Sequence, residues 1–366
     1  MRKTIIIISL VALLTVVLTY GIADAKVTGP CSNCHTMHNS QQGAHMQYLA
    51  PGEEDIGPKG ALLRGTCLGC HTATDGSTWK SSITGAPIVF NTSEPVFNEA
   101  KGLAAGNFYW VQTEDTKGHN IFSQDSKLSV APGDMGFSGC GTNNCHTNFH
   151  LAVSGTGNPA LDGKQGCTKC HMVNTVGPKG FHHKDDGTGT KYVDTAEKGW
   201  YRFLEGHMSG SGHGVAGIED DDWQYTYSST DHNEYLGSQV SGGYGFGGLG
   251  NTMTAYCTGC HGVFHDNQGT ASPWLRHPSD KILPTSGEYA AYTTYDPLVP
   301  VARPSSFDWE GGPSSMVSGT HGDMVMCLSC HRAHASPYFK MMRWDYRGWP
   351  GSGATNGCNV CHTSKN

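Results

Sequence analysis

One short pattern recurs along the chain and accounts for every cysteine in it. Six times the sequence reads Cys, two other residues, Cys and His, and a seventh copy has four residues between its cysteines. The six regular units are Cys31/Cys34/His35, Cys67/Cys70/His71, Cys167/Cys170/His171, Cys257/Cys260/His261, Cys327/Cys330/His331 and Cys358/Cys361/His362, and the stretched unit is Cys140/Cys145/His146. An even number of cysteines in an exported protein normally indicates disulfides, but a disulfide framework does not explain a histidine after each pair.

This spacing is the signature of covalent haem attachment. Two thiols bond to the vinyl groups on one edge of the porphyrin, and cysteines at i and i+3 face the same side of a helical turn. The histidine that follows then points at the iron from that side. Zinc binding or dithiol redox chemistry is the alternative for the regular units, and a lone disulfide is the alternative for Cys140 and Cys145. We therefore expect seven covalently bound haem c groups.

The composition agrees with an interior that contains more than aliphatic side chains. Leu, Ile, Val and Phe together make up about 17% of the chain, a low share for a folded protein, and charged residues are only 15%. The 50 glycines allow backbone to approach flat macrocycles closely. The sequence therefore predicts a multihaem cytochrome c fold, mostly coil and short α-helices with little β-structure, whose core is formed by stacked haems.

The first 25 residues have the three parts of a secretory signal. Arg2 and Lys3 precede the apolar run 5–18, and Ala23-Asp24-Ala25 forms an A-x-A cleavage site. The apolar run is short for a membrane span, and an uncleaved anchor is the alternative. We expect a cleaved signal peptide over 1–25, a single multihaem domain over 26–366 without a membrane span, and secretion to the cell surface or beyond.

Thirteen histidines lie outside the attachment units, enough for every iron to have a second histidine ligand. Four of them follow an attachment histidine by three or four residues and so share its helical face. Because the two ligands of one iron approach from opposite sides of the ring, such a histidine must serve another haem. The candidates for the distal position are His38, His119, His150, His207, His265, His277, His321 and His334. A surface position or a contact with a haem propionate is the alternative for each, and methionine could replace histidine at an iron.

Charge excludes some partners. The net charge is −7 and no run of Lys or Arg occurs, which argues against nucleic acid and anionic membrane surfaces. The acidic stretch Glu219-Asp220-Asp221-Asp222 could hold calcium, but it lacks EF-hand spacing, which favours a solvated loop.

The residues around several units resemble the extracellular filament-forming multihaem cytochromes of the OmcS type. The resemblance is carried by His35-Thr-Met-His38-Asn-Ser, Lys117-Gly-His119-Asn-Ile, Leu275-Arg-His277-Pro, Cys327-Leu-Ser-Cys330-His331-Arg-Ala-His334-Ala-Ser and the last unit at Cys358. It covers the first 120 or so mature residues loosely and residues 253–366 well. It implies a head-to-tail homopolymer in which His38 binds the iron attached at Cys327, Cys330 and His331 of the next subunit.

Residues from about Cys140 to His232 depart from that pattern. The OmcS-type protein has six haems, whereas this chain has seven attachment units, with the units at Cys140 and Cys167 only 27 residues apart. One of these two is additional, and its distal ligand is expected from the same region. His207 and His213 resemble the Gly-His setting of His119, while His182 and His183 are weaker candidates.

Three functions are consistent with these residues. The favoured one is an electron-transfer protein that polymerises into a conductive filament with a continuous haem chain. A monomeric periplasmic or surface electron shuttle is the alternative, since it shares every haem motif. A multihaem reductase is less favoured, because catalysis needs an open iron position or an unusual proximal ligand and no Cys-x-x-Cys-Lys unit occurs. The redox donor and acceptor are unknown.

Overall fold

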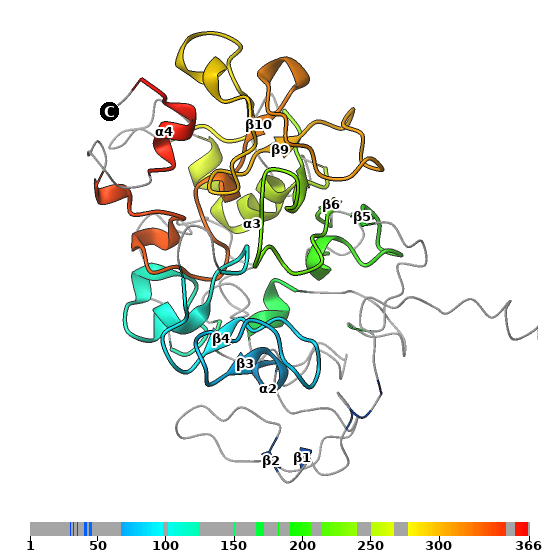
Figure 1. Cartoon of the computed structure of the whole chain (residues 1–366), viewed down its shortest axis with the longest axis vertical. Helices are drawn as coiled ribbons and strands as arrows, with labels where there is room; N and C mark the ends of the chain where they lie inside the picture. The colour runs from blue at the N-terminus through cyan, green and yellow to red at the C-terminus, as the bar shows by residue number, and fades with distance from the viewer. Residues whose placement is uncertain are drawn as a thin grey trace, which may run out of the picture.

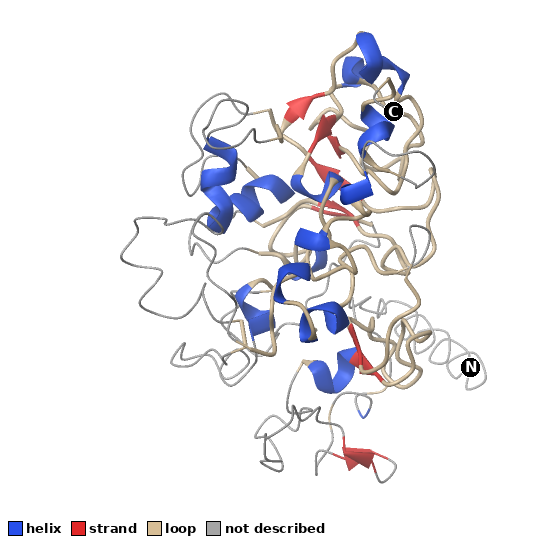
Figure 2. Cartoon of the chain, turned by 90° about the vertical axis from the view of Figure 1, so that its left-hand side faces the viewer, coloured by secondary structure: helices blue, strands red, loops and turns tan. Residues whose placement is uncertain are grey.

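The chain is built from short elements joined by long loops (Figure 2). The computed structural model describes residues 30, 32, 35, 40–41, 44–45, 67–97, 102–123, 149–150, 166–171, 182, 191–205, 214–239, 250–266, 277–348 and 356–364. The signal peptide expected over 1–25 and the stretched unit at Cys140 lie outside these residues. Within the described part, no helix is long and apolar enough to cross a membrane.

Most helices are single turns, because attachment units and turn-forming residues interrupt the chain before a longer helix can propagate. The α-helices are α2 (Leu68–His71), α3 (Met253–Asp266) and α4 (Cys358–Cys361). The 3₁₀ helices are η2 (Phe108–Gln112), η3 (Asp115–Lys117), η4 (Gly166–Lys169), η5 (Tyr201–Phe203), η6 (Gly287–Ala291), η7 (Gly319–His321), η8 (Cys327–Ser329), η9 (Phe339–Met341) and η10 (Tyr346–Gly348). The sparse helical structure that the sequence predicts is therefore confirmed for the described residues.

The strands are two or three residues long, yet six of them form one sheet. They are β5 (Tyr192–Val193), β6 (Gly217–Ile218), β7 (Glu234–Leu236), β8 (Lys281–Ile282), β9 (Ala302–Arg303) and β10 (Met324–Val325). Their order is β5-β6-β7-β9-β10-β8, antiparallel except for the parallel pair β7 and β9. This sheet was not predicted, because strands this short show no alternation of polar and apolar residues.

Two smaller sheets lie nearer the N-terminus. Strands β1 (Ser40–Gln41) and β2 (Ala44–His45) are antiparallel, whereas β3 (Thr72–Ala73) and β4 (Phe90–Asn91) are parallel. The pair β3 and β4 directly follows the attachment turn α2, so it holds that turn against the loop that ends at Phe90.

The core is divided into four small clusters, and attachment cysteines belong to or border three of them. Cys257 packs against the cluster that includes Tyr235 and Met324, while Cys330, Cys358 and Cys361 pack against those of Trp344 and Tyr292. A fourth cluster surrounds Leu68 beside α2, and its members are Leu68, Phe90, Phe108, Trp110, Val111, Ile121 and Ala335. Buried apolar side chains thus gather around the attachment units.

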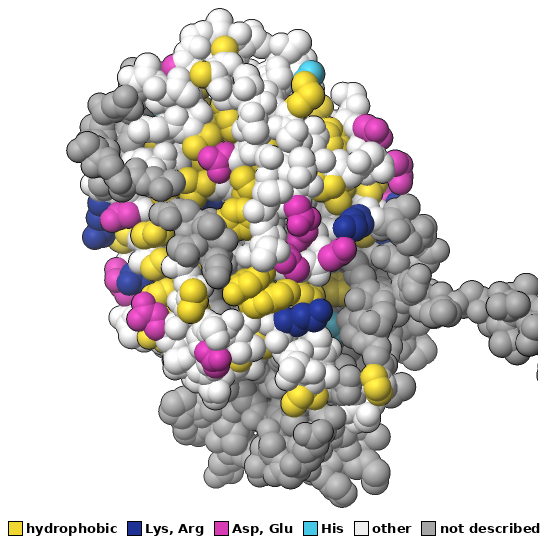
Figure 3. All heavy atoms as spheres, viewed as in Figure 1, with side chains coloured by type: hydrophobic (Ala, Val, Ile, Leu, Met, Phe, Trp, Pro, Cys, Tyr) yellow, Lys and Arg dark blue, Asp and Glu magenta, His cyan; other side chains and the backbone are white. Residues whose placement is uncertain are grey.

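The attachment units at α2, α3 and α4 are spread along the longest axis of the molecule. Figure 1 shows α2 with β3 and β4 toward one end of this axis, α3 in the middle and α4 toward the other end. On the face drawn in Figure 3, acidic and basic side chains of the described residues form small separate groups with apolar side chains between them. These units therefore form a row and do not surround a single central site.

Candidate haem-attachment sites

The attachment units that the structure describes in full fold as helical turns. In four units the histidine amide donates to the carbonyl oxygen of the first cysteine, at 3.1 Å for His71, 2.8 Å for His171, 3.1 Å for His331 and 2.8 Å for His362. This bond between i+4 and i places the cysteines and the histidine on one side of the turn, as the spacing predicts. In the first unit His35 is described and partly buried. The side chains of Cys31, Cys34, Cys140, Cys145, His146 and Cys260 lie outside the described residues.

Cys70 and Cys170, the second cysteines of their units, are partly buried. Their amides donate to the carbonyl oxygens of Cys67 and Cys167 at 3.1 and 3.2 Å, and the Cys170 carbonyl accepts from the Tyr256 hydroxyl. The turn geometry suits thioether bonds to haem at Cys70 and Cys170, and these bonds stay a prediction.

The described cysteines hold no disulfide. Their surroundings raise the pKa of Cys167, Cys330, Cys358 and Cys361, whereas a hydrogen bond with Cys257 lowers the pKa of Cys327. Burial, together with the thiols of the neighbouring unit, raises the pKa of Cys330 to about 12, and burial raises that of Cys361 to about 12. A hydrogen bond with Cys67, and then burial, raises the pKa of Cys167 well above its usual value. A raised pKa disfavours the free thiolate that a redox dithiol uses at these positions.

These contacts also show which units are neighbours. The Cys67 thiol meets Cys167, the Cys257 thiol meets Cys327, and Cys330 lies within electrostatic reach of Cys358. Units far apart in the sequence therefore lie side by side, and the unit that begins at Cys327 has neighbours on two sides.

Four imidazole pairs face one another across the spaces beside these turns. Their ring centres are 6.3 Å apart for His71 and His182, 6.0 Å for His171 and His334, 6.1 Å for His261 and His119, and 6.2 Å for His362 and His277. A bond from a metal to an imidazole nitrogen is about 2 Å long, so two rings that share one metal have centres roughly 6 Å apart. Each pair joins one attachment histidine to one histidine from elsewhere, with a separation that fits a single iron between them.

Hydrogen bonds orient these rings for metal binding. The Nδ1–H group of His71 donates to the Pro87 carbonyl at 2.8 Å, that of His171 to Arg202 at 2.9 Å, and that of His331 to Lys340 at 2.9 Å. His119 and His277 donate in the same way, to the carbonyls of Ala333 at 2.8 Å and Pro278 at 2.9 Å. A carbonyl oxygen can only accept, so in each neutral ring Nε2 keeps the lone pair that a metal needs.

Burial keeps the rings neutral. It lowers the pKa of His71, His119, His171, His277 and His331 below the usual value. The effect is largest at His261, whose pKa falls to about 4, and at His334, whose pKa falls to about 3. Because only neutral imidazole binds a metal, this environment suits ligands. His277 is the exception in exposure, since much of its side chain reaches solvent.

His232 shows the opposite arrangement and is structural. Its Nδ1 lies 3.0 Å from the Ser228 carbonyl and its Nε2 lies 3.1 Å from Glu234 Oε1, so neither nitrogen is available to a metal. The ring stacks on Tyr295, and Glu234 forms a buried ion pair with Arg303. Nothing in the sequence around His232 separates it from the ligand candidates.

The structure places the predicted distal histidines in three groups. His119, His277 and His334 face attachment histidines, and His334 faces His171 rather than His331, its neighbour in the sequence. His321 is exposed at the end of η7, and His150 is partly buried; neither faces an imidazole among the described residues. His38, His207 and the side chain of His265 lie outside them. His182, a weaker candidate in the sequence, is the histidine that faces His71.

Two carbonyls that orient attachment histidines come from left-handed turns. Arg202 has φ 49° and is followed by Phe203 at 61°, while Lys340 has φ 59° and is followed by Met341 at 51°. Residues other than glycine adopt this conformation at a cost, and they concentrate at functional positions. In both turns an aromatic residue is followed by a cationic residue and then by an apolar one. This shared sequence pattern could have identified the two turns.

A buried arginine tests whether these sites fit haem. Arg332 directly follows His331 and is 1% exposed, and its Nε and Nη2 make no hydrogen bond within the described part of the chain. Its Nη1 donates to the Leu103 carbonyl at 2.6 Å, and its guanidinium lies 4.7 Å from the centre of the Phe97 ring. Burial lowers its pKa to about 9. A buried cation with unsatisfied nitrogens fits a group that brings its own carboxylates, as the propionates of haem do.

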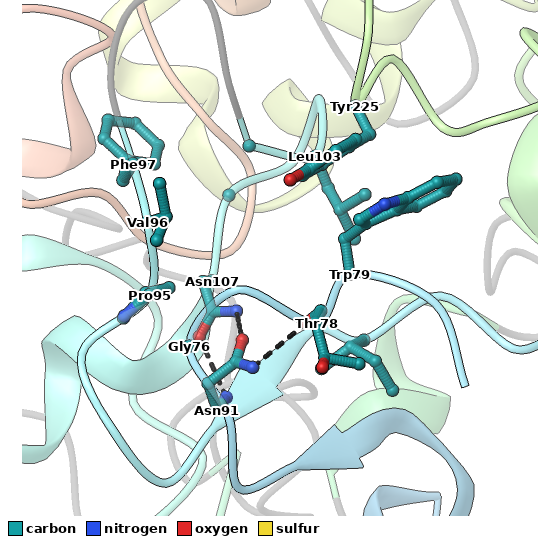
Figure 4. Close-up of a pocket in the computed structure, with 13 residues that line it drawn as sticks. Gly76, Thr78, Trp79, Asn91, Pro95, Val96, Phe97, Leu103, Asn107 and Tyr225 are labelled. Carbon is teal, nitrogen blue, oxygen red and sulfur yellow. Dashed lines mark hydrogen bonds between the residues drawn. The ribbon is translucent and has the colours of Figure 1, made fainter. Parts of the chain in front are cut away.

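A small hollow lies beside Phe97 and Leu103 (Figure 4). The side chains of Asn91 and Asn107 point toward each other there and are joined by a 2.6 Å hydrogen bond. The described residues that line it include no cysteine or histidine, so this hollow is not one of the attachment sites.

The acidic stretch from Glu219 to Asp222 is occupied by protein partners. Asp220 accepts from the Gln224 amide at 2.7 Å, Asp222 accepts from the Tyr225 amide at 3.0 Å, and Glu219 accepts from the Arg202 amide at 2.5 Å. No group of three His, Cys, Asp or Glu side chains among the described residues is arranged to hold a metal ion. These carboxylates brace turns, and Asp220 is buried, so only Asp221 is solvated as the loop interpretation expects.

Comparisons with known proteins point to the same class of site. Residues 321–366 match the family described as "Doubled CXXCH motif". The protein "C-type cytochrome OmcS" of Geobacter sulfurreducens is 27% identical over 370 residues, which cover 86% of this chain and 78% of that protein. Two solved structures, "Outer Membrane Cytochrome S Filament from Geobacter Sulfurreducens" and "Cryo-EM of the OmcS nanowires from Geobacter sulfurreducens", each align over 88% of this chain and 85% of theirs, with a TM-score of 0.42 and 20% identity. The chain is thus similar in sequence to a multihaem c-type cytochrome over most of its length.

Proposed function

We propose that the chain is an exported seven-haem cytochrome that carries electrons outside the cell and polymerises into a conductive filament. The observation that carries the proposal is the set of four opposed imidazole pairs, each made of one attachment histidine and one distant histidine at 6.0–6.3 Å. Similarity to OmcS supports an extracellular electron-transfer role.

Covalently bound haem supplies an iron that gains and loses one electron, and the chain supplies everything that holds it. We assign the fourteen cysteines to thioether bonds and the seven unit histidines to the proximal positions. We assign His182, His334, His119 and His277 as distal partners of His71, His171, His261 and His362. Two histidines on every iron leave no open coordination position, which favours electron transfer over reduction of a small substrate.

The attachment units that the structure describes lie next to one another, which favours a continuous path. His331 and His334 are three residues apart but do not share a helical turn, because η8 ends at Ser329 and His331 bridges to Met342. They serve different irons in our assignment because His334 faces His171. The neighbouring thiols of Cys67 and Cys167, and of Cys257 and Cys327, bring two further pairs of sites together. Short separations between haems favour fast electron tunnelling.

Polymerisation is proposed to complete the site at His331. This ring is oriented by Lys340. Its described imidazole neighbour within electrostatic reach is His119, which we assign to His261. An iron there needs a second ligand, and the resemblance assigns this role to His38 of the next subunit. A head-to-tail contact of this kind produces an open filament unless its rotation closes a ring.

Intact mass and electron microscopy of the exported protein test the proposal. We expect a chain that begins at Lys26, carries seven haems including one on Cys140 and Cys145, and forms filaments in the extracellular fraction. Six haems would remove the stretched unit from the assignment. A seven-haem protein that stays monomeric would support the shuttle, and rapid turnover of nitrite or hydroxylamine would support a reductase.

A further inference from the structure

The last attachment unit is oriented differently from the others. The structure shows the Nδ1 partner of four attachment histidines, and for His71, His171 and His331 it is a neutral backbone carbonyl. For His362 it is a carboxylate, because Nδ1 lies 3.2 Å from Glu288 Oε1. No sequence motif marks this partner, which lies 74 residues away.

The Glu288 side chain is held in place by the C-terminal segment. Its Oε2 accepts from the Ser364 hydroxyl at 2.6 Å, and its backbone carbonyl accepts from the Thr363 hydroxyl at 2.9 Å. Its side chain is only 14% exposed. Three consecutive residues of the C-terminal segment therefore contact Glu288, and both carboxylate oxygens are occupied.

A carboxylate at this position changes the ligand as well as orienting it. By accepting from Nδ1–H it makes the imidazole more basic, and Nε2 becomes a stronger donor to a metal. Its negative charge also favours the oxidised iron, which carries one more positive charge than the reduced iron. A backbone carbonyl provides only a dipole, so both effects are weaker at the other three histidines.

Solvent also reaches this site. The His362 side chain is 27% exposed, and His277, the residue that faces it, is exposed overall. Water stabilises the more highly charged oxidised state, so this exposure also lowers the reduction potential.

We infer that Glu288 is a positioning residue that gives the haem at Cys358 and Cys361 the lowest reduction potential of these four sites. The inference rests on the proposed function, since it requires a haem at this unit. An electron on this haem then passes with favourable free energy to the neighbouring site at Cys327 and Cys330, so that the first iron is oxidised and the second is reduced. The unit at His362 is therefore suited to receive electrons into the chain.

The test uses Glu288→Gln in the full-length haem-loaded protein. Glutamine keeps the shape and an accepting oxygen but removes the charge. We expect the number of attached haems and the low-spin spectrum to be unchanged. In a redox titration followed by electron paramagnetic resonance, the haem with the lowest midpoint potential should titrate at a more positive potential. Glu288→Ala should shift the same haem. The matched control is Glu310→Gln, an exposed carboxylate remote from the attachment residues in our assignment, which should leave the titration unchanged.

Two outcomes separate this inference from the proposed function. A Glu288→Gln titration that superimposes on the parent curve, with seven low-spin haems still attached, would overturn the role of Glu288 and leave the cytochrome proposal intact. Absence of haem on Cys358 and Cys361 in the parent protein would overturn the cytochrome assignment itself.

Discussion

The sites at His171 and His331 have the same local geometry, but the residues around His171 come from more distant parts of the sequence than those around His331. In both, a helical turn presents the histidine, and a left-handed cationic residue accepts from its Nδ1. The His171 site takes Arg202 from η5 and His334 from the segment after η8. The His331 site takes Lys340 from only nine residues away, and its described imidazole neighbour, His119, is assigned to His261.

The two turns are also braced differently. The Arg202 guanidinium donates to the Asp220 carbonyl and to Asn233 Oδ1 at 3.0 Å, and its amide donates to Glu219. The Lys340 turn is held by bonds within its own segment, including Arg332 N to Met341 O at 2.9 Å. A self-contained site can leave one side for a ligand from another subunit, whereas a site assembled from distant segments is complete within the chain. Four predictions test this difference.

Removal of the ligand proposed to cross between subunits should have the largest effect. We expect His38→Ala to keep seven haems attached, to convert one iron to high spin and to abolish filaments, because the His331 site loses its only proposed distal ligand. Electron microscopy and absorption spectra check this. Filaments with a wholly low-spin spectrum would show that His38 is an intrasubunit ligand or has no ligand role.

His334→Ala is the matching substitution for a ligand that is proposed to act within one subunit. It removes the ring that faces His171 at 6.0 Å, so one iron of the seven should become high-spin while filaments persist. The same two measurements apply. Loss of filaments in this variant as well would mean that the two sites do not differ in the way proposed.

Glycine substitutions at Lys340 and Arg202, the two left-handed positions, should change the stability of the protein in opposite directions. Lys340→Gly relieves a strained backbone conformation and should raise stability by about 0.5 to 1 kcal/mol. Arg202→Gly relieves the same strain but deletes the contacts with Asp220 and Asn233, so we expect a net loss of about 1 to 3 kcal/mol. Thermal unfolding of the haem-loaded variants distinguishes them, and equal shifts would contradict the difference in bracing.

The last prediction concerns the carboxyl of Asp220, a residue whose backbone carbonyl accepts from the Arg202 guanidinium. Burial, with Asp222 as neighbour, raises the pKa of Asp220 to about 7. Between about pH 4 and 7 the unfolded chain ionises this group while the folded chain keeps it protonated, so its contribution to stability falls as the pH rises. Asp220→Asn should remove this slope, worth at most about 1 to 2 kcal/mol after solvent screening. Denaturant unfolding across this range measures it, and Asp221→Asn, an exposed neighbour, should retain the slope.

Short-range features of the fold followed from the sequence because they depend on neighbouring residues. The turn at each described unit and the scarcity of long helices are fixed by spacing and by turn-forming residues. The sheet was missed because its strands are too short to carry a pattern and pair across long separations, as β7 does with β9.

The pairing of histidines shows the same limit. The candidates His119, His277 and His334 were identified from the sequence, but His182 was ranked low and His232 could not be set apart, because the sequence does not reveal what surrounds each ring. The attachment chemistry, the likeness between units and the need for distal histidines were determined by the sequence alone, since thiol and imidazole positions on one turn suffice for them. The facing partner of each ring, the carbonyl or carboxylate at each Nδ1, and the burial that keeps the rings neutral were decided only by the tertiary structure, because they depend on contacts between segments far apart in the chain.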